Sequence, residues 1–281
     1  MADNKHGEEQ LCTLEKRGNL FILTLTGAGE HRLNPNLLSS LRSALSRLKS
    51  DPSASSSTLI TTAHGKFFSN GYDLDWAQSS EPRLQLMSSA LRSLVRDLIC
   101  LPMPTIAAVT GHASAAGMML ALSHDYVVMR RDRGFLYMSE MDIGLVIPNW
   151  FMALLRAKIG DPRARREAVM RAAKLTAEDG VRMGVVDSAQ DGAEAAVAAA
   201  AELGEALVAR KWDGHVYAGN RRVVLREVLE AIGSDETVKK VAEDKARSKL
   251  YLGLLLRPVS GVLVKLFGPL GRSAASYSTF H

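Results

Sequence analysis

The sequence is poor in the residues and motifs that mark several large protein classes. Its 281 residues include two cysteines, Cys12 and Cys100, which form no metal-type spacing, so we expect free thiols and a reducing compartment. Aromatic residues make up 6% of the chain, and the basic residues do not cluster with them as in nucleic-acid-binding modules. The first ten residues are polar and of mixed charge, so we expect neither a secretory signal nor a transit peptide.

Common cofactor and catalytic motifs are missing or incomplete. Gly27 and Gly29 follow a predicted strand, but Arg32 stands where the dinucleotide fingerprint needs its third glycine. There is no P-loop and no G-x-S-x-G nucleophile elbow. The histidines lack metal-ligand spacing, so we expect no metal site.

The sequence also lacks a long, clean hydrophobic run. Residues 249–271 are strongly apolar, but charged residues, glycines and a proline interrupt them before about 20 apolar residues accumulate. These interruptions argue against a membrane span. We expect a helix that packs against the domain or a neighbouring subunit, with contact to a membrane surface as the less favoured alternative.

What is present is the composition of an ordinary globular protein. Hydrophobic residues make up 47% of the chain, and 281 residues are enough for one large domain or two modest ones. The formal net charge is +5. This excess of basic residues suits a phosphate-bearing ligand better than nucleic acid, although an ordinary solvated surface is the simplest explanation of it.

The hydrophobic periodicity predicts alternating strands and helices, followed by a helical remainder. A hairpin is expected over 11–27, and Asn34 and Pro35 form a typical helix start. From Pro148 onward the pattern is helical almost throughout, which favours an α/β core with a helical C-terminal part. Further strands are predicted over 57–63, 104–111, 126–130 and 135–140, and helices over 150–159, 162–173, 176–183 and 193–211.

Two glycine-containing turns follow predicted strands. The first is Phe68-Ser69-Asn70-Gly71-Tyr72-Asp73-Leu74, in which Asp73 can cap the next segment. The second, Gly111–Gly117, consists almost entirely of small residues and precedes the apolar segment Met118–Leu122. Both place backbone amides at strand ends, where α/β folds commonly bind ligands. A crowded packing of helix against strand is the plain alternative.

One carboxylate accompanies these turns. Glu140 closes the predicted strand over 135–140, directly after Ser139. A strand-end salt bridge would explain an isolated glutamate, whereas a base facing the two turns would explain the combination.

Together these residues resemble the crotonase superfamily, the enoyl-CoA hydratases and isomerases. The family's first turn has the form F-(S/A)-x-G-x-D-(L/I), which residues 68–74 match. Its glycine-rich second turn and following D-(Y/I) are matched by Gly111–Gly117 and Asp125-Tyr126. Its third element is matched by Glu140 and Gly144-Leu145-Val146. The likeness is strongest to the monofunctional delta3,delta2-enoyl-CoA isomerases, including those of plants.

The resemblance implies roles for particular residues. Glu140 would be the catalytic base, and the backbone N–H groups of Tyr72 and Ala116 would form an oxyanion hole for the thioester oxygen. Hydratases carry a second glutamate where this chain has Met119, which favours isomerisation over hydration. Ala116 itself stands where many members have glycine. The residues implied in substrate binding are Ser69, Asn70, Gly71, Tyr72, Asp73, Ala116, Met119 and Ser139.

The resemblance also implies a fold and a setting. The expected fold is a crotonase-type α/β spiral of ββα repeats, with an acyl-CoA-binding core over 11–200 and a helical trimerisation region over 201–281. The substrate would be an acyl-CoA, with no cofactor besides the coenzyme A it carries, and the assembly a homotrimer or a dimer of trimers. Relatives suggest a peroxisome, although the sequence ends Tyr277–His281 rather than in S-K-L, which leaves the cytoplasm as the alternative.

The predicted function is therefore the shift of a 3-enoyl-CoA double bond to 2-trans-enoyl-CoA in the β-oxidation of unsaturated fatty acids. Two alternatives remain open. One is another acyl-CoA reaction of the same superfamily, such as hydration. The other is a non-catalytic scaffold that keeps the CoA pocket.

Overall fold

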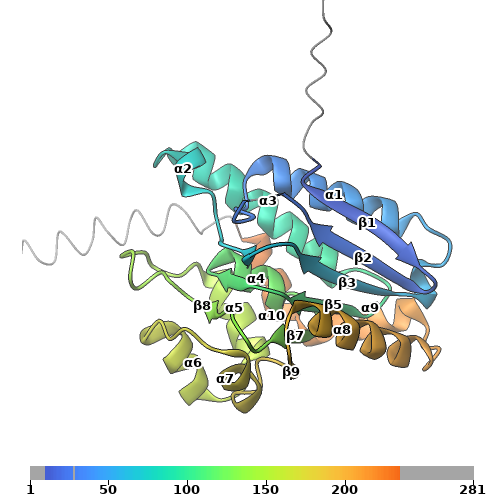
Figure 1. Cartoon of the computed structure of the whole chain (residues 1–281). Helices are drawn as coiled ribbons and strands as arrows, with labels where there is room; N and C mark the ends of the chain where they lie inside the picture. The colour runs from blue at the N-terminus through green and yellow to red at the C-terminus, as the bar shows by residue number, and fades with distance from the viewer. Residues whose placement is uncertain (1–9, 28, 235–281) are drawn as a thin grey trace, which may run out of the picture. The chain divides into compact units, whose positions relative to one another are not determined.

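A mixed sheet is the centre of the fold in the computed structural model, which describes residues 10–27 and 29–234 (Figure 1). Within these residues the sheet has six strands. The first two pair antiparallel as the predicted hairpin, and all later neighbours pair parallel. In sheet order the strands are β1 (Cys12–Arg17), β2 (Leu20–Leu25), β3 (Thr58–Ala63), β5 (Thr105–Val109), β7 (Tyr126–Arg130) and β9 (Ser188–Gln190).

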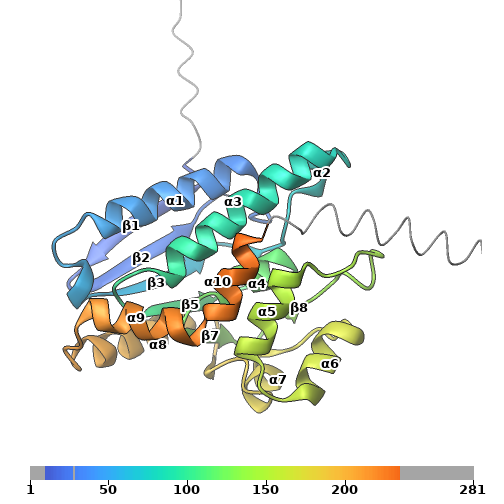
Figure 2. The ribbon, with the colours of Figure 1, turned by 180° about the vertical axis from the view of Figure 1, so that it is seen from behind.

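Both faces of this sheet are covered, so its central strands are apolar on both sides. Figure 1 shows α8 (Ala193–Val208) over one face, and Figure 2 shows α1 (Pro35–Lys49) and α3 (Glu81–Ile99) over the other. Successive strand residues alternate between the two faces. The side chains packed with α8 are Leu20, Ile60, Ile106, Ala108 and Val128. Those packed in the larger cluster with α1 and α3 include Leu59, Ala107, Val109, Val127 and Met129.

A second, smaller sheet reveals the repeat of the fold. It contains β4 (Phe67–Ser69), β6 (His112–Ser114) and β8 (Leu136–Tyr137), which pair parallel. Each follows a strand of the large sheet and precedes helical structure: α2 (Leu74–Ala77) and α3 after β4, α4 (Ala116–Leu122) after β6, and α5 (Asn149–Lys158) after β8. This is the predicted series of ββα units, and it brings the ends of β4, β6 and β8 side by side.

The later part of the described chain is mainly helical, as predicted. After α5 come α6 (Pro162–Met170), α7 (Ala177–Arg182), α8, α9 (Gly214–Val224) and α10 (Arg226–Gly233). The short strand β9 was not predicted, because Ser-Ala-Gln carries no alternating apolar signal and pairs only through its backbone with β7. No helix of the described part is long and apolar enough to cross a membrane. The apolar tail over 249–271 and the final residues 277–281 lie outside the described residues.

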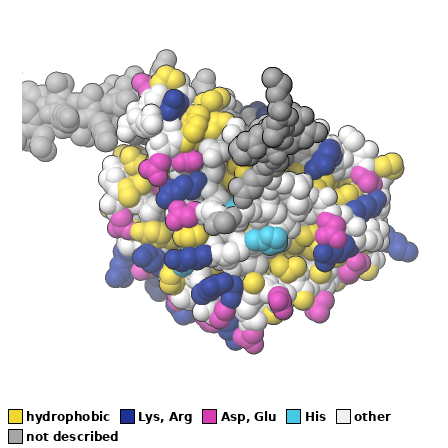
Figure 3. All heavy atoms as spheres, turned by 45° about the horizontal axis from the view of Figure 1, so that its top comes forward, with side chains coloured by type: hydrophobic (Ala, Val, Ile, Leu, Met, Phe, Trp, Pro, Cys, Tyr) yellow, Lys and Arg dark blue, Asp and Glu magenta, His cyan; other side chains and the backbone are white. Residues whose placement is uncertain are grey.

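On the face seen in Figure 3, charged side chains form no large patch of one sign. There, Lys and Arg side chains are interspersed with Asp and Glu side chains. On this face the basic excess is therefore spread over an ordinary solvated surface.

Candidate active site

The first turn runs from the end of β4 into α2. Gly71 has a φ of +79°, a left-handed conformation that favours glycine. A side chain there would also place its Cβ 2.9 Å from the Ser114 carbonyl oxygen and 3.5 Å from the Ala116 nitrogen. The lack of a Cβ at Gly71 thus allows the first turn to lie against the second.

The segment just before α1 holds the first turn in place. The Asn70 N–H donates to the Glu30 carbonyl at 2.9 Å, and the Leu33 N–H donates to the Gly71 carbonyl at 2.7 Å. The Ser69 hydroxyl, fully buried, donates to the His31 carbonyl at 2.8 Å. No motif marked residues 30–33 as part of the site. Most of these hydrogen bonds use backbone groups, which leave no residue-type signal in a sequence, although the Asn70 side-chain amide also donates to the Glu30 carboxylate at 2.8 Å.

The second turn carries strain that the sequence did not reveal. Ala115 has a φ of +49° and a ψ of −118°, a conformation costly for a residue with a side chain. Its N–H donates to the Tyr137 carbonyl at 2.6 Å, which ties the turn to β8. Gly117 follows in the first turn of α4, and a Cβ there would lie 2.1 Å from the Ser69 carbonyl oxygen. The small residues of 111–117 therefore let two chain segments approach closely.

Two backbone donors are left over at this approach. Among the described residues, neither the Tyr72 N–H nor the Ala116 N–H has a hydrogen-bond acceptor. For Ala116 this is expected, because it is the first residue of α4 and its N–H has no partner within the helix. Buried amides are normally paired, so two unpaired donors in one region indicate a place for an acceptor atom.

Glu140 lies in the turn after β8, and the predicted strand over 135–140 was too long. Only Leu136 and Tyr137 pair with β6, because β6 itself ends at Ser114, the partner of Tyr137. Ser139 lies in the same non-strand segment as Glu140 and accepts the Asp142 N–H through its carbonyl oxygen at 3.0 Å.

The Glu140 side chain is 5% exposed, and its Oε2 atom has no hydrogen-bond partner among the described residues. Burial raises the pKa of this carboxyl, because desolvation disfavours the charged form; a hydrogen bond with its own backbone partly offsets the rise. A buried carboxylate without an ion pair is costly to a fold, so the salt-bridge alternative finds no support here. Its setting suits a group that exchanges protons.

The position of the hydratases' second glutamate holds no titratable group. Met119 is fully buried in the larger hydrophobic cluster, as is Met118. Both methionines therefore contribute to core packing.

An aromatic group stands close to this region. The Tyr72 ring stacks with Phe151 at a centroid distance of 6.4 Å, and Phe151 meets Trp150 edge-on at 4.4 Å. Burial raises the pKa of the Tyr72 hydroxyl, Ser88 and the charge of Arg92 partly offset this rise, and the charge of Glu140 adds a smaller increase. Tyr72 Oη and Trp150 Nε1 are buried without a hydrogen-bond partner among the described residues. Trp150 is not among the predicted site residues, because an aromatic residue at a helix start is usually a packing residue.

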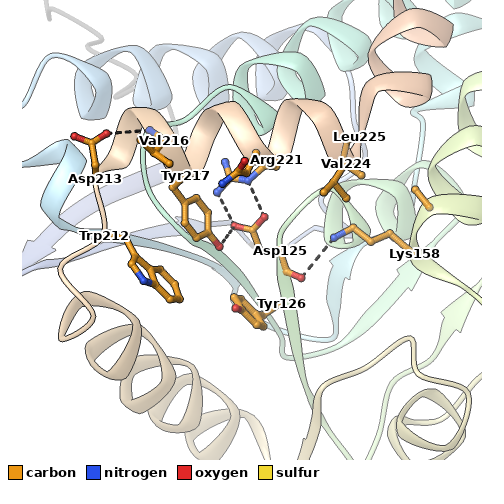
Figure 4. A pocket seen from close by; sticks show the side chains of 12 residues that line it. Asp125, Tyr126, Lys158, Trp212, Asp213, Val216, Tyr217, Arg221, Val224 and Leu225 are labelled. Atoms are coloured by element: carbon orange, nitrogen blue, oxygen red, sulfur yellow. Dashed lines mark hydrogen bonds and ion pairs between the residues drawn. The ribbon is translucent and has the colours of Figure 1, made fainter.

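A separate cavity of about 600 Å³ lies near the C-terminal end of α4 (Figure 4). Arg221 of α9 binds both carboxylate oxygens of Asp125 there, at 2.7 and 2.6 Å, and the Tyr217 hydroxyl donates to Asp125 at 3.2 Å. None of the predicted site residues lines this cavity. Asp125, part of the recognised motif, thus acts as an anchor for α9. Within the described chain no cluster of His, Cys, Asp and Glu is arranged to hold a metal ion.

Comparison with known proteins agrees with this geometry. A family model described as "Enoyl-CoA hydratase/isomerase" matches residues 19–216. The chain is 62% identical over 232 residues to "Enoyl-CoA delta isomerase 1, peroxisomal" of Arabidopsis thaliana, covering 82% of this chain and 97% of that protein. It is 52% identical to "Enoyl-CoA delta isomerase 2, peroxisomal" of the same plant, covering 81% and 98%.

Solved structures show the same fold at low sequence identity. A probable enoyl-CoA hydratase of Mycobacterium tuberculosis superposes with a TM-score of 0.75 at 22% identity, covering 86% of this chain and 99% of that one. At this identity the likeness establishes the fold alone.

Proposed function

Because the chain belongs to the enoyl-CoA hydratase/isomerase family, we propose that it moves the double bond of a 3-enoyl-CoA to give 2-trans-enoyl-CoA. The names of its plant relatives, which are enoyl-CoA delta isomerases, support this reaction. The observation that carries the proposal is one buried carboxylate, Glu140, without an ion-pair partner, while the position of a second carboxylate is filled by the core residue Met119.

The proposed mechanism uses Glu140 as a single base. Its carboxylate takes a proton from C2 of the 3-enoyl thioester, and the electron pair moves onto the thioester oxygen to form a dienolate. The same carboxyl then returns the proton to C4, so that the double bond ends between C2 and C3 and Glu140 is ionised again. A raised pKa suits this reversible transfer, since the acid form must be accessible during the cycle.

The Tyr72 and Ala116 N–H groups would stabilise the dienolate. C2 protons of a thioester are acidic only when the enolate oxygen is bound, and each donor of this kind contributes about 3 kcal/mol to the transition state. Their lack of an acceptor among the described residues supports this assignment. Around them, Ser69, Asn70, Gly71 and Asp73 would shape the first turn and Ser139 would lie beside the base. Met119 would line the pocket for the acyl chain from within the core.

The experiment is an assay of the pure protein with 3-hexenoyl-CoA, in which the conjugated enoyl thioester is followed by its absorbance. We expect steady formation of the conjugated product and little or no hydration of 2-hexenoyl-CoA. Hydration as fast as isomerisation would favour the hydratase alternative. Tight binding of acyl-CoA without turnover would favour the scaffold alternative.

The assembly and setting are proposed on the same premise. An acyl-CoA is the small-molecule partner, and no further cofactor is needed because Glu140 alone carries the proton. We propose a homotrimer, or a dimer of trimers, with the core over 11–200 and the helical region over 201–281 as its parts. The names of the two plant relatives support a peroxisomal location, which imaging of a fluorescent fusion at the N-terminus would test.

A further inference from the structure

Two side chains on either side of the first turn bind each other directly. Asn34 Nδ2 donates to Asp73 Oδ2 at 3.1 Å. The remaining oxygen of each side chain caps a helix. Asn34 Oδ1 accepts the Leu37 N–H of α1 at 3.1 Å, and Asp73 Oδ1 accepts the Trp76 N–H of α2 at 3.0 Å. The starts of two helices are thus joined through one hydrogen bond.

This hydrogen bond lies beside a backbone bridge that includes Tyr72. Leu33, the neighbour of Asn34, bridges Tyr72 in a parallel arrangement: its N–H donates to Gly71, and its carbonyl accepts the Asp73 N–H. In extended backbone, alternate residues direct their N–H groups to opposite sides. Since Gly71 and Asp73 face Leu33, the Tyr72 N–H faces away from it. The position of that donor therefore depends on how firmly residues 71–73 are held against residues 33–34.

Backbone hydrogen bonds hold the two ends of residues 71–73 with unequal strength. The Leu33–Gly71 hydrogen bond is short, at 2.7 Å, but the Asp73–Leu33 hydrogen bond beyond Tyr72 is long, at 3.4 Å. The helix that follows Asp73, α2, has only 4 residues, whereas α1 has 15 and buries six side chains in the core. The Asn34–Asp73 hydrogen bond ties the weakly held end of the turn to α1, which is anchored in the core.

We propose that Asn34 and Asp73 are positioning residues for the oxyanion hole, which they serve by fixing the Tyr72 N–H. Neither side chain is assigned a contact with the reacting atoms. The inference rests on the proposed isomerase function. In this role Asp73 binds other parts of the protein rather than the substrate, because each of its carboxylate oxygens already accepts a hydrogen bond from the protein.

The test is a reciprocal exchange of the two residues. In Asn34→Asp two carboxylates face each other, and in Asp73→Asn two amide groups compete, while an oxygen remains available to cap each helix. The double variant Asn34→Asp/Asp73→Asn restores one donor and one acceptor, with both caps and the net charge unchanged. Asp161→Asn is the matched control, since Asp161 caps α6 at 2.8 Å and contacts no residue of the site.

The readouts are kcat and KM for 3-hexenoyl-CoA at a temperature where every variant is folded, with thermal unfolding followed separately. We expect each single exchange to lower kcat by roughly 10- to 100-fold with little change in KM, because small displacements of a transition-state donor are costly. The double exchange should return kcat to within about threefold of the wild type. The Asp161 control should keep wild-type kcat.

Two results would overturn the inference while leaving the function intact: a single variant with wild-type kcat, or a double variant as slow as the slower single one. Loss of kcat only in proportion to loss of folded protein would also contradict it, since that indicates a purely structural role. A wild-type protein that binds acyl-CoA but shows no isomerisation would instead overturn the proposed function, and the positioning role with it.

Discussion

At the scale of single residues, Glu140 links stability to chemistry. Its raised pKa means that the folded protein binds this proton more tightly than the unfolded chain does. Folding stability therefore falls as the pH rises from the ordinary glutamate pKa through the folded-state pKa, where the buried carboxyl becomes ionised. Above the folded-state pKa the protein carries a buried charge that destabilises it and that the proposed reaction requires.

Glu140→Gln separates these two effects. We expect isomerase turnover to fall by at least about 100-fold, because the amide cannot accept the C2 proton. Above the folded-state pKa the variant should unfold at a higher temperature than the wild type, and this difference should shrink as the pH falls through the folded-state pKa to the ordinary glutamate pKa. In the wild type, the acidic limb of the kcat/KM profile should lie above the pH range of an ordinary carboxylate.

Assays of turnover and calorimetry across pH check these outcomes. Glu205→Gln, at an exposed position of α8, is the control and should change neither property. Near wild-type turnover in Glu140→Gln would show that another group is the base.

Ala116 is the second residue where a small change is informative. Ala116→Val leaves the N–H in place but adds a branched side chain beside the approach of the thioester oxygen, so we expect turnover to drop by roughly 100-fold. Ala116 is fully buried, so the larger side chain also costs about 1–3 kcal/mol of packing free energy. Ala116→Gly, the common residue of the family, should keep activity within a small factor.

Ala121→Val is the matched control for packing, because Ala121 is also fully buried on α4. It should lower the unfolding temperature without a comparable loss of turnover in the folded enzyme. If Ala116→Val folds and turns over normally, the small-residue passage is only a packing device.

Sequence reasoning selected these residues by type but could not foresee their environments. The motif pointed to Ala116, yet it gave no sign of the strained backbone at Ala115 or of the hydrogen bond between the Ala115 N–H and Tyr137. Likewise, nothing local predicted that Asn34 would bond Asp73, since 39 residues separate them in the chain. Such contacts depend on the tertiary fold.

At the scale of elements, the close approach of β4 to α4 is what creates the site. Gly117→Ala should disrupt it, because the added Cβ would lie 2.1 Å from the rigid Ser69 carbonyl oxygen. We expect a loss of about 2–4 kcal/mol in the free energy of unfolding, as for other changes that force buried backbone apart. Isomerase turnover should fall as well. It is expressed per folded protein, with the folded fraction taken from chemical denaturation curves.

Gly219→Ala in the middle of α9 is the matched control. A Cβ at Gly219 meets nothing within 4 Å. The substitution should therefore stabilise the protein by about 0.5–1 kcal/mol through helix propensity alone. Equal effects of the two substitutions would contradict the assignment of Gly117 to a close approach.

Most elements were predictable from periodicity, and their ends were not. The Asn34–Pro35 start of α1 was confirmed, because helix capping is a local signal. The predicted strand at 135–140 shrank to Leu136–Tyr137, because its length is set by the three-residue partner β6, which the sequence analysis did not recognise as a strand.

At the scale of the whole molecule, α9 is joined to the core by one buried cation. Arg221 bonds Asp125 and also donates to the carbonyl oxygens of Leu98 and Leu101 near the end of α3. The sequence predicted helical structure beyond residue 201 but could not predict this docking, which joins positions about a hundred residues apart. Three valines of α9 are exposed in the described part of the chain: Val216, Val223 and Val224 are 62%, 68% and 74% exposed.

That surface leads to the prediction for the assembly. Trp212, Val216 and Val224 also line the cavity of Figure 4, and exposed apolar side chains beside a hollow are typical of an interface with another chain. If the protein is the proposed trimer, light scattering should give about three times the chain mass of 30.5 kDa, or six times for a dimer of trimers. Val224→Glu should shift the population toward single chains, because a charge at a buried contact is costly to desolvate.

Met170→Glu, at a residue 62% exposed on α6, is the control and should leave the mass unchanged. A wild-type protein that scatters as a single chain across a range of concentrations would show that the trimer proposal is wrong and that the apolar side of α9 has another use.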